Sequence, residues 1–263
     1  MTGGRQEGLA LVAVLWGVSI LALIAAAMLT ASLTVARIEH NKWDTDRAGA
    51  ADDGAIQLAI LLLMDDRAKR QPRIDGTPER LDFDGITVAV CIEAESGKIN
   101  VNFADKDLMV RLFEAAGVAN ENADKLADRI VDRRTSIPNR HAFLSLDGLM
   151  TVPGMTRELL ERLKPDLTVY GTNGVVDEKV ATRDVLKILA DLRGQSLSDL
   201  LKARDESPTA NNDPDAPVSP LGAPGASFTI TAESGVNNAH VIRKAVVLFT
   251  GDTARPYLVQ DWD

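Results

Sequence analysis

Side chains that commonly carry out catalysis or bind metals are few in this sequence. The single cysteine, Cys91, excludes an internal disulfide and a multi-cysteine metal site. It lies in a β-rich stretch, where we expect a buried small apolar residue rather than a nucleophile. The three histidines, His40, His141 and His240, are far apart and lack the spacing of a metal-ligand motif. With no catalytic triad or paired-carboxylate spacing, the chain is predicted not to be an enzyme.

Acidic residues are the remaining candidates for metal binding. None of their clusters follows the loop with a central glycine and a distal glutamate that binds calcium in EF-hands. We therefore predict no cofactor, although calcium is the ion that the acidic composition suggests, and we favour solvated surface carboxylates. The three clusters are Asp65-Asp66, Asp105 with Asp107, and Asp213 with Asp215.

The composition is that of an acidic globular protein. Its 263 residues are 45% hydrophobic and 25% charged, which is enough for a hydrophobic core, and we expect this core to be divided into two parts. The net charge of -9 argues against a nucleic-acid backbone as the main partner.

The N-terminal region has the properties of a membrane anchor. From Leu9 to Ala36 there is no Asp, Glu, Lys or Arg. A helix needs about 20 apolar residues to cross the hydrocarbon core, so residues 9–36 are predicted to be the transmembrane half of a long N-terminal helix. The alternative is a plain signal peptide or single-pass anchor. A signal peptide, however, has a basic start, a shorter apolar segment and a cleavage site at its far end.

Gly8 stands directly before this apolar run, an arrangement that resembles a prepilin leader. The resemblance implies that residues 1–8 are removed by cleavage after Gly8, so that Leu9 becomes the mature N-terminus. The fifth residue counted from Leu9 is Ala13, where most pilins have glutamate. This departure either weakens the pilin interpretation or selects a pseudopilin class that typically lacks the glutamate.

The anchor is predicted to continue as a helix beyond the membrane. Apolar residues with helical spacing between Ala55 and Met64 need a covering surface, which a sheet would provide. A separate short helix after a break at Gly49 or Gly54 is the alternative. Residues 81–92 then predict a β-hairpin around Asp84-Gly85, because this pair tolerates the positive φ angles of a tight turn. Alternate residues of its second strand, Ile86, Val88, Val90 and Ile92, are expected to pack on the helix.

Residues 96–204 predict an inserted helical domain. Helices are expected around Leu108–Phe113, Ala123–Val131, Asp147–Met150 and Arg157–Leu163, followed by a helix capped by Thr182 or Asp184 and a short helix at Leu197–Leu201. The Ile99-Asn100-Val101-Asn102 and Val152-Pro153-Gly154 segments resemble helix-hairpin-helix modules. Between Gly97 and Gly171 there are 11 Lys plus Arg and 11 Asp plus Glu, whereas a DNA-binding face is basic.

The chain is predicted to return to a sheet after a linker. Residues 205–225 are rich in Pro, Asn, Asp, Ala and Gly and predict a flexible linker. Strands are expected at Phe228–Ala232, His240–Phe249 and Tyr257–Trp262. Together with the hairpin they give an α+β fold, with a pilin-like long N-terminal helix packed on an antiparallel sheet. The pilin-like domain comprises residues 37–95 and 226–263.

The order of these elements resembles the K-type minor pseudopilin (GspK) family of type II secretion systems over essentially the whole chain. The matching segments are residues 8–16, 95–102, 126–134, 149–155 and the closing strands at 228 and 245–247. The absence of glutamate at Ala13 fits this family.

The resemblance implies a non-enzymatic assembly protein at the tip of the pseudopilus, acting in protein export across the outer membrane. Its implied partners are the minor pseudopilins I and J, the major pseudopilin G, and the prepilin peptidase, which would cleave after Gly8 and methylate Leu9. No nucleic acid is expected to bind. The implied location is the inner membrane, as a single-pass protein with its C-terminal domain in the periplasm. Charge counting alone does not select this topology, because Arg5 faces Arg37, Lys42 and Arg47 across the span.

A second hypothesis is a membrane-anchored helix-hairpin-helix DNA-binding receptor, which would share the anchor and the Ile-Asn-x-Asn motif. The acidic composition, the β segments and Gly8 favour the first hypothesis.

Overall fold

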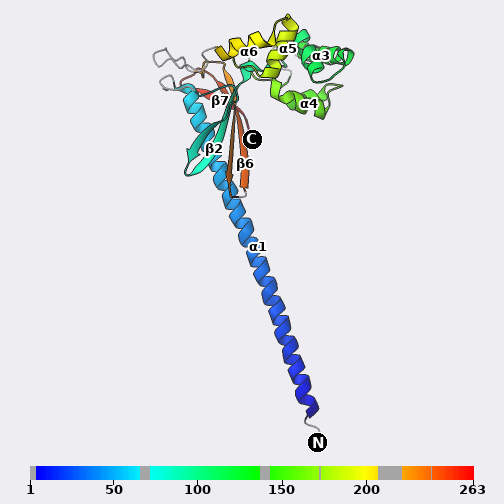
Figure 1. The fold of residues 1–263 in the computed structure, drawn as a ribbon, viewed down its shortest axis with the longest axis vertical. Coiled ribbons are helices and arrows are strands. Elements are labelled where there is room, and N and C mark those ends of the chain that lie inside the picture. Colours follow the sequence, from blue (N-terminus) through cyan, green and yellow to red (C-terminus); the bar gives the residue numbers. More distant parts are fainter. Residues whose placement is uncertain (1–3, 66–71, 137–142, 172, 207–220, 238) are drawn as a thin grey trace.

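The fold is built on one very long helix. The computed structural model describes residues 4–65, 72–136, 143–171, 173–206, 221–237 and 239–263, and side chains from Val14 onward except 31–34 and 206. Helix α1 runs without a break from Gly4 to Met64. Its N-terminal half projects alone, and its C-terminal half lies along a sheet (Figure 1). A continuous rod is therefore confirmed, and the alternative with a break at Gly49 or Gly54 is wrong.

The upper half of α1 is held by its buried apolar face. Ala55, Ile56, Ala59, Ile60 and Leu63 are each at most 2% exposed. They recur at the three- and four-residue spacing that places side chains on one face of a helix. Apolar residues of the sheet cover this face in one hydrophobic cluster, so the packing predicted from the sequence is confirmed.

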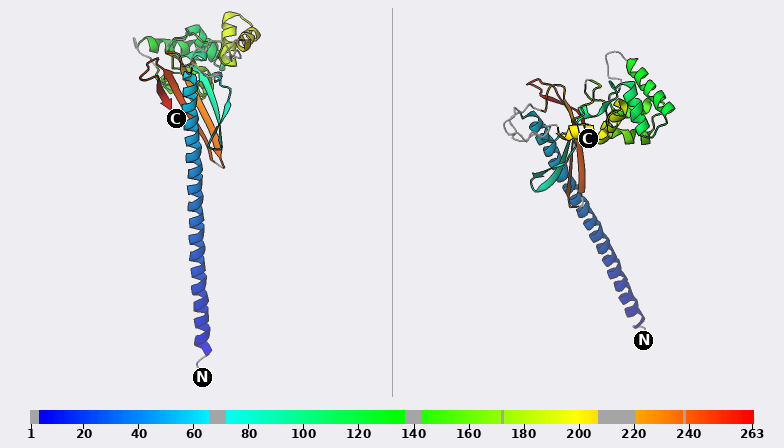
Figure 2. Two further views of the ribbon diagram at one scale, coloured as in Figure 1. Left: turned by 90° about the vertical axis from the view of Figure 1, so that its left-hand side faces the viewer. Right: turned by 45° about the horizontal axis from the view of Figure 1, so that its top comes forward.

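The sheet is antiparallel, and the chain leaves it once. Among the described residues its strands lie in the order β1-β2-β5-β6-β7. The helical domain is inserted between β2 and β5, which are neighbours in the sheet. Figure 2 shows the same arrangement from two further directions, with α1 along the sheet and the helical domain beyond the end of the strands. The strands are β1 (Glu79–Phe83), β2 (Ile86–Ala94), β5 (Ser227–Val236), β6 (Ala239–Phe249) and β7 (Tyr257–Trp262).

The β1–β2 hairpin has the predicted turn. Asp84 and Gly85 have φ angles of 52° and 76°, as a two-residue turn with both central residues left-handed requires. Alternate β2 residues from Ile86 to Ile92 are buried. Cys91 alternates with these buried residues, so its side chain lies on the sheet face away from α1 and is half-buried. The expectation that it is a buried core residue is therefore wrong. Burial still raises the pKa of its thiol, as do Glu93 and Glu233, which disfavours the reactive thiolate.

The helical domain contains both α-helices and tighter turns. One correction concerns Leu146–Thr151, which forms a 3-10 helix where an α-helix was expected. Thr182 is the cap of α5, as predicted, and its hydroxyl accepts a hydrogen bond from the Val185 N–H. The elements are β3 (Ile99–Asn100), α2 (Lys106–Ala115), α3 (Asn120–Thr135), α4 (Arg157–Leu163), β4 (Leu167–Thr168), α5 (Arg183–Arg193), α6 (Leu197–Glu206), and further 3-10 helices at Glu95–Gly97 and Lys164–Asp166.

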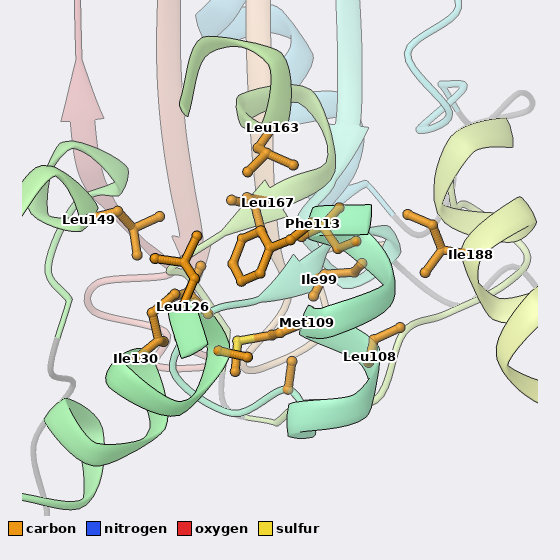
Figure 3. Close-up of a cluster of buried hydrophobic side chains, with 14 of the residues drawn as sticks. Ile99, Leu108, Met109, Phe113, Leu126, Ile130, Leu149, Leu163, Leu167 and Ile188 are labelled. Carbon is orange, nitrogen blue, oxygen red and sulfur yellow. The ribbon is translucent and has the colours of Figure 1, made fainter. Parts of the chain in front are cut away.

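A second hydrophobic cluster forms the centre of this domain. Phe113 and Met109 of α2 meet Leu126 and Ile130 of α3, and Leu163 and Leu167 close the cluster from another side (Figure 3). Its members come from residues 99–189, whereas almost all of the other cluster comes from α1 and the sheet. The described residues thus form two hydrophobic cores.

The Ile-Asn-x-Asn motif serves the structure of this domain. Asn102 Nδ2 donates to the carbonyl oxygen of Phe143 at 2.9 Å, and its Oδ1 accepts from the Phe143 N–H at 3.0 Å. Asn100 Nδ2 donates to the Tyr170 carbonyl oxygen at 2.6 Å. Both side chains bind backbone more than 40 residues away in sequence, so the motif ties distant segments to β3.

A segment that we call the strap, residues 173–181, joins the two cores. Its Val176 belongs to the core of the helical domain and its Val180 to the core of the sheet. The Asp177 N–H donates to the Ser96 carbonyl oxygen at 2.8 Å. The strap therefore crosses the point where the chain leaves β2.

A buried ion pair lies at the same junction. Lys98 Nζ is 2.8 Å from Glu95 Oε1 and 2.8 Å from Glu93 Oε2. Thr229 of β5 donates to Glu95 Oε1 at 2.6 Å, so the network reaches the sheet. Burial alone would lower the pKa of Lys98, but Glu95 and Glu93 raise it above its ordinary value, and the ammonium stays charged.

Replacing Lys98 with methionine is expected to destabilise the chain by about 3–5 kcal/mol, because it leaves the buried Glu95 carboxylate without its cation. The double change Lys98→Met with Glu95→Gln is expected to restore most of that loss. Urea unfolding of the four members of this cycle measures both effects. Lys106→Met is the control, since Lys106 makes its ion pairs with Asp124 and Asp128 at the surface. A loss for Lys98→Met no larger than the control would contradict the network's role.

The described end of the predicted linker, from residue 221, is in contact with both α1 and the sheet. The Gly222 N–H donates to the Leu63 carbonyl oxygen at 2.9 Å, and the Gly225 N–H donates to the Phe249 carbonyl oxygen at 2.7 Å. Residues 207–220, the main part of that linker, lie outside the described residues.

Candidate membrane anchor and partner-facing surfaces

The part of α1 from Val14 to Leu29 is not covered by any of the described residues. Between Val14 and Leu29 every described large apolar side chain is at least 47% exposed, the value for Ile24. The most apolar 18-residue window of the described helix has a mean hydropathy of 2.3, and none of it is buried. Exposed apolar surface of this extent is unfavourable in water, so the segment is a candidate membrane span.

The length of the charge-free run exceeds the minimum for a span. Residues 9–36 are 28 residues, which as a helix measure about 42 Å, against about 30 Å for the hydrocarbon core. Excess length of this kind is accommodated by helix tilt or by extension into the headgroup region.

The predicted processing residues lie at the start of this helix. Gly8, Leu9 and Ala13 are within the helical backbone of α1, and their side chains lie outside the described residues. Cleavage after Gly8 and methylation of Leu9 stay predictions.

Polar groups hold α1 where it meets the sheet. We call this region the neck, and it comprises Asp44, Ala48 and Asp52 of α1 with Ser234 and Asn237 beside them. Asn237, in the turn between β5 and β6, donates to Asp44 Oδ2 at 2.9 Å. The Ser234 hydroxyl donates to the Ala48 carbonyl oxygen at 3.2 Å. Asp44 is 3% exposed, so these contacts are shielded from water. They fix the position along α1 at which contact with the sheet begins. That position is Asp44, eight residues after Ala36.

Asp52 is the residue of the neck that is least favourable for the stability of the folded chain. It is fully buried, and neither carboxylate oxygen has a hydrogen-bond partner among the described residues. Burial raises the pKa of Asp52 above its ordinary 3.8, as does Asp53, while the nearby Ser234 hydroxyl, Arg243 and His240 oppose this rise. A carboxyl whose pKa is raised by folding costs stability once the unfolded chain ionises.

The change Asp52→Ala is expected to raise the free energy of unfolding near pH 7 by about 1–3 kcal/mol, the range for an unsatisfied buried polar group. The contribution of Asp52 to wild-type stability should fall as the pH rises from 3.8 toward the raised pKa, and then become level. The advantage of the variant should therefore grow across that window. Urea unfolding at several pH values measures it, and Asp46→Ala, an exposed change on the same helix, is the control. A variant that is less stable than wild type at pH 7 would refute the expectation.

Of the residues considered for catalysis or metal binding, those that the structure describes are not brought together. His40 lies 3.6 Å from Asp44, and His240 lies 2.8 Å from Glu233, in two separate pairs. Asp105 precedes α2 and Asp107 lies in its first turn. In the described part of the chain no group of three or more His, Cys, Asp or Glu side chains has the arrangement of a metal site. Asp66, His141, Asp213 and Asp215 lie outside the described residues.

Three arginines near the helical hairpins contact other parts of the helical domain. Arg134 Nη1 donates to the Ala104 carbonyl oxygen at 2.7 Å, and Arg129 Nη1 donates to the Pro153 carbonyl oxygen at 2.6 Å. Arg133 donates to the Thr151 hydroxyl and lies over the Phe143 ring. These contacts, with the balanced charge of the region, favour a structural role over an extended nucleic-acid surface.

Sequence reasoning missed the neck and the Lys98 network. A signal for the first was present, because Asp52 lies one helical turn before Ile56, on a continuation of the face that was expected to be buried between Ala55 and Met64. For the second, Lys98 and Glu95 are three residues apart, but the sequence contains no sign that Thr229 would join them.

A long helix packed on an antiparallel sheet, with an apolar half extending beyond it, defines a pilin-like α+β fold. Neither a family model nor a curated protein matches the sequence. A solved structure does match: the crystal structure of the GspK-GspI-GspJ complex from the type 2 secretion system of enterotoxigenic Escherichia coli. The matching chain is 16% identical, with 86% of this chain and 98% of that chain covered and a TM-score of 0.54. The chain therefore has a GspK-like fold.

Proposed function

We propose that this chain is a minor pseudopilin at the tip of a type II secretion pseudopilus, acting in pseudopilus assembly and in protein export across the outer membrane. The observation that carries the proposal is the GspK-like fold over most of the chain, joined to an uncovered apolar helix. The similar structure is a complex of three pseudopilins, which supports minor pseudopilins I and J as partners. The major pseudopilin G and a prepilin peptidase complete the proposed set.

The proposed place of the chain is the inner membrane, crossed once by α1, with the sheet and the helical domain in the periplasm. Processing after Gly8 would leave Leu9 as a methylated N-terminus. The role is assembly, without enzymatic activity.

Ala13 supports a terminal position in the pseudopilus. A carboxylate at the fifth mature position pairs with the N-terminal ammonium of a neighbouring subunit, and such a charge within the membrane is favourable only with its partner. A tip subunit has no subunit above it to pair with, so alanine is sufficient there.

The N-terminal sequence and intact mass of the protein, purified from cells that contain the secretion system, test the proposal. The expected product is residues 9–263 with one added methyl group. Affinity purification of the same protein is expected to recover pseudopilins I and J. An uncleaved Met1, together with salt-dependent binding of DNA, would instead establish the membrane-anchored DNA receptor.

A further inference from the structure

A basic hollow lies between α3 and α4 in the helical domain. It measures about 500 Å³ and is lined by residues of both helices and of the two hairpins that precede them. Three of its lining residues are cationic and none is acidic, although the chain as a whole has a net charge of -9. The cations are Lys125, Arg129 and Arg162, and the other polar lining residues are Asn122 and Thr156.

The two guanidinium groups are held in place by crossed hydrogen bonds. Arg129 of α3 donates from Nη1 to the Pro153 carbonyl oxygen, in the hairpin before α4, at 2.6 Å. Arg162 of α4 donates from Nη1 to the Ala116 carbonyl oxygen, in the hairpin before α3, at 2.9 Å, and from Nε to the Glu158 carbonyl oxygen of its own helix at 3.4 Å. Each helix is thus tied to the other hairpin, and both exposed arginine side chains already have a backbone partner beside the hollow.

These contacts leave charge and donors unused. A guanidinium has five N–H donors, and carbonyl oxygens carry no compensating charge. Within the described residues neither Arg129 nor Arg162 forms a salt bridge with a carboxylate, whereas Lys125 is paired with Glu121 at 2.6 Å. Two guanidinium groups that line one hollow, and that are not in a salt bridge within the described residues, match the oxygens of a phosphate or carboxylate group.

The surroundings restrict the ligand to a compact one. Glu121 and Glu158 lie on the same two helices and would repel an extended polyanion. The helical domain is also at the end of the molecule farthest from the N-terminus (Figure 1), so the headgroups of the membrane that holds α1 are out of reach.

We propose that this hollow binds one compact oxyanion, a phosphate or a carboxylate group, through Arg129 and Arg162 together. The group is either free in solution or carried on the surface of a protein. The inference does not depend on the role in secretion.

The test uses the full chain in detergent micelles, with arginine side chains labelled for NMR. Inorganic phosphate, and separately a Gly/Ser peptide with a single glutamate, are titrated at constant ionic strength. Saturable shifts of the Nε–H signals of Arg129 and Arg162, with the Arg80 signal of β1 unchanged, are expected. Saturation by phosphate alone indicates a free anion, and saturation by the peptide as well indicates a protein-borne carboxylate. Both results support the site.

Variants separate ordered binding from general salt effects. Arg129→Gln with Arg162→Gln is expected to weaken phosphate binding by about tenfold or more, since two charge-assisted hydrogen bonds are lost. Arg80→Gln is the matched control. The wild-type titration decides the matter even if the double variant does not fold. Shifts that never saturate, or a duplex DNA that binds with a steep salt dependence while phosphate does not bind, would overturn the proposal.

Discussion

Replacing Gly97 with alanine is expected to destabilise the chain by about 3 kcal/mol, because the new methyl group would meet backbone that cannot move aside. An ideal Cβ at Gly97 lies 2.6 Å from the Val180 carbonyl oxygen and 2.8 Å from its carbonyl carbon. Relief of this overlap requires the strap to lift, which withdraws Val180 from the core of the sheet. Urea unfolding measures the loss, and hydrogen exchange should show faster exchange at the Asp177 N–H.

A matched change in the same domain separates this contact from a general effect of alanine. At Gly148 the added Cβ would have an ordinary contact, 3.6 Å from the Phe143 ring, so Gly148→Ala should change stability far less. If the two variants unfold at the same urea concentration, the strap is not held closely against residue 97.

The second large effect is expected at the cleavage site after Gly8, and this prediction rests on the proposed function. Gly8→Val is expected to abolish maturation, because the proposed cleavage follows Gly8 and the substitution places a branched side chain directly before the cleaved bond. The uncleaved chain keeps Arg5 and Glu7 ahead of the apolar segment and has no free Leu9 amine. Intact mass of the purified protein distinguishes the two forms, and export of a secreted protein measures the consequence.

Gly17→Val is the control for this experiment. Gly17 lies on the same helix, and a Cβ there would meet nothing within 4 Å, so the variant should be processed like the wild type. Cleavage of the Gly8→Val variant after residue 8, at the wild-type level, would show that Gly8 has been wrongly assigned as the processing residue.

Features set by local spacing were predictable from the sequence. The continuous helix α1 and the face it buries follow from helical periodicity, and the hairpin at Asp84-Gly85 follows from a two-residue turn signal. The insertion of a helical domain between strands followed from the spacing of apolar residues, which changes along the chain from alternation to helical spacing and back. Each of these depends on residues close together in sequence.

Features set by contacts between distant segments were not predictable in this way. The exposure of Cys91 depends on which face of β2 meets α1, and the Lys98 network depends on Thr229, 131 residues further on. The strap has no regular secondary structure, and its position is fixed by close approach of Gly97 and by Val180. The Ile-Asn-x-Asn motif was visible as a motif, but its function as a tie to Phe143 and Tyr170 required the three-dimensional arrangement.

The register of β2 and β5 has a consequence for how this architecture changes in size. Ala94, the last residue of β2, is paired with Phe228, near the start of β5. The two points where the helical domain joins the sheet are therefore adjacent, and a chain that leaves and returns at one place can lengthen or shorten with little cost in closure entropy. A larger or smaller domain could thus be inserted at this site on the same scaffold, and a short turn in place of residues 95–227 would leave a helix packed on a sheet.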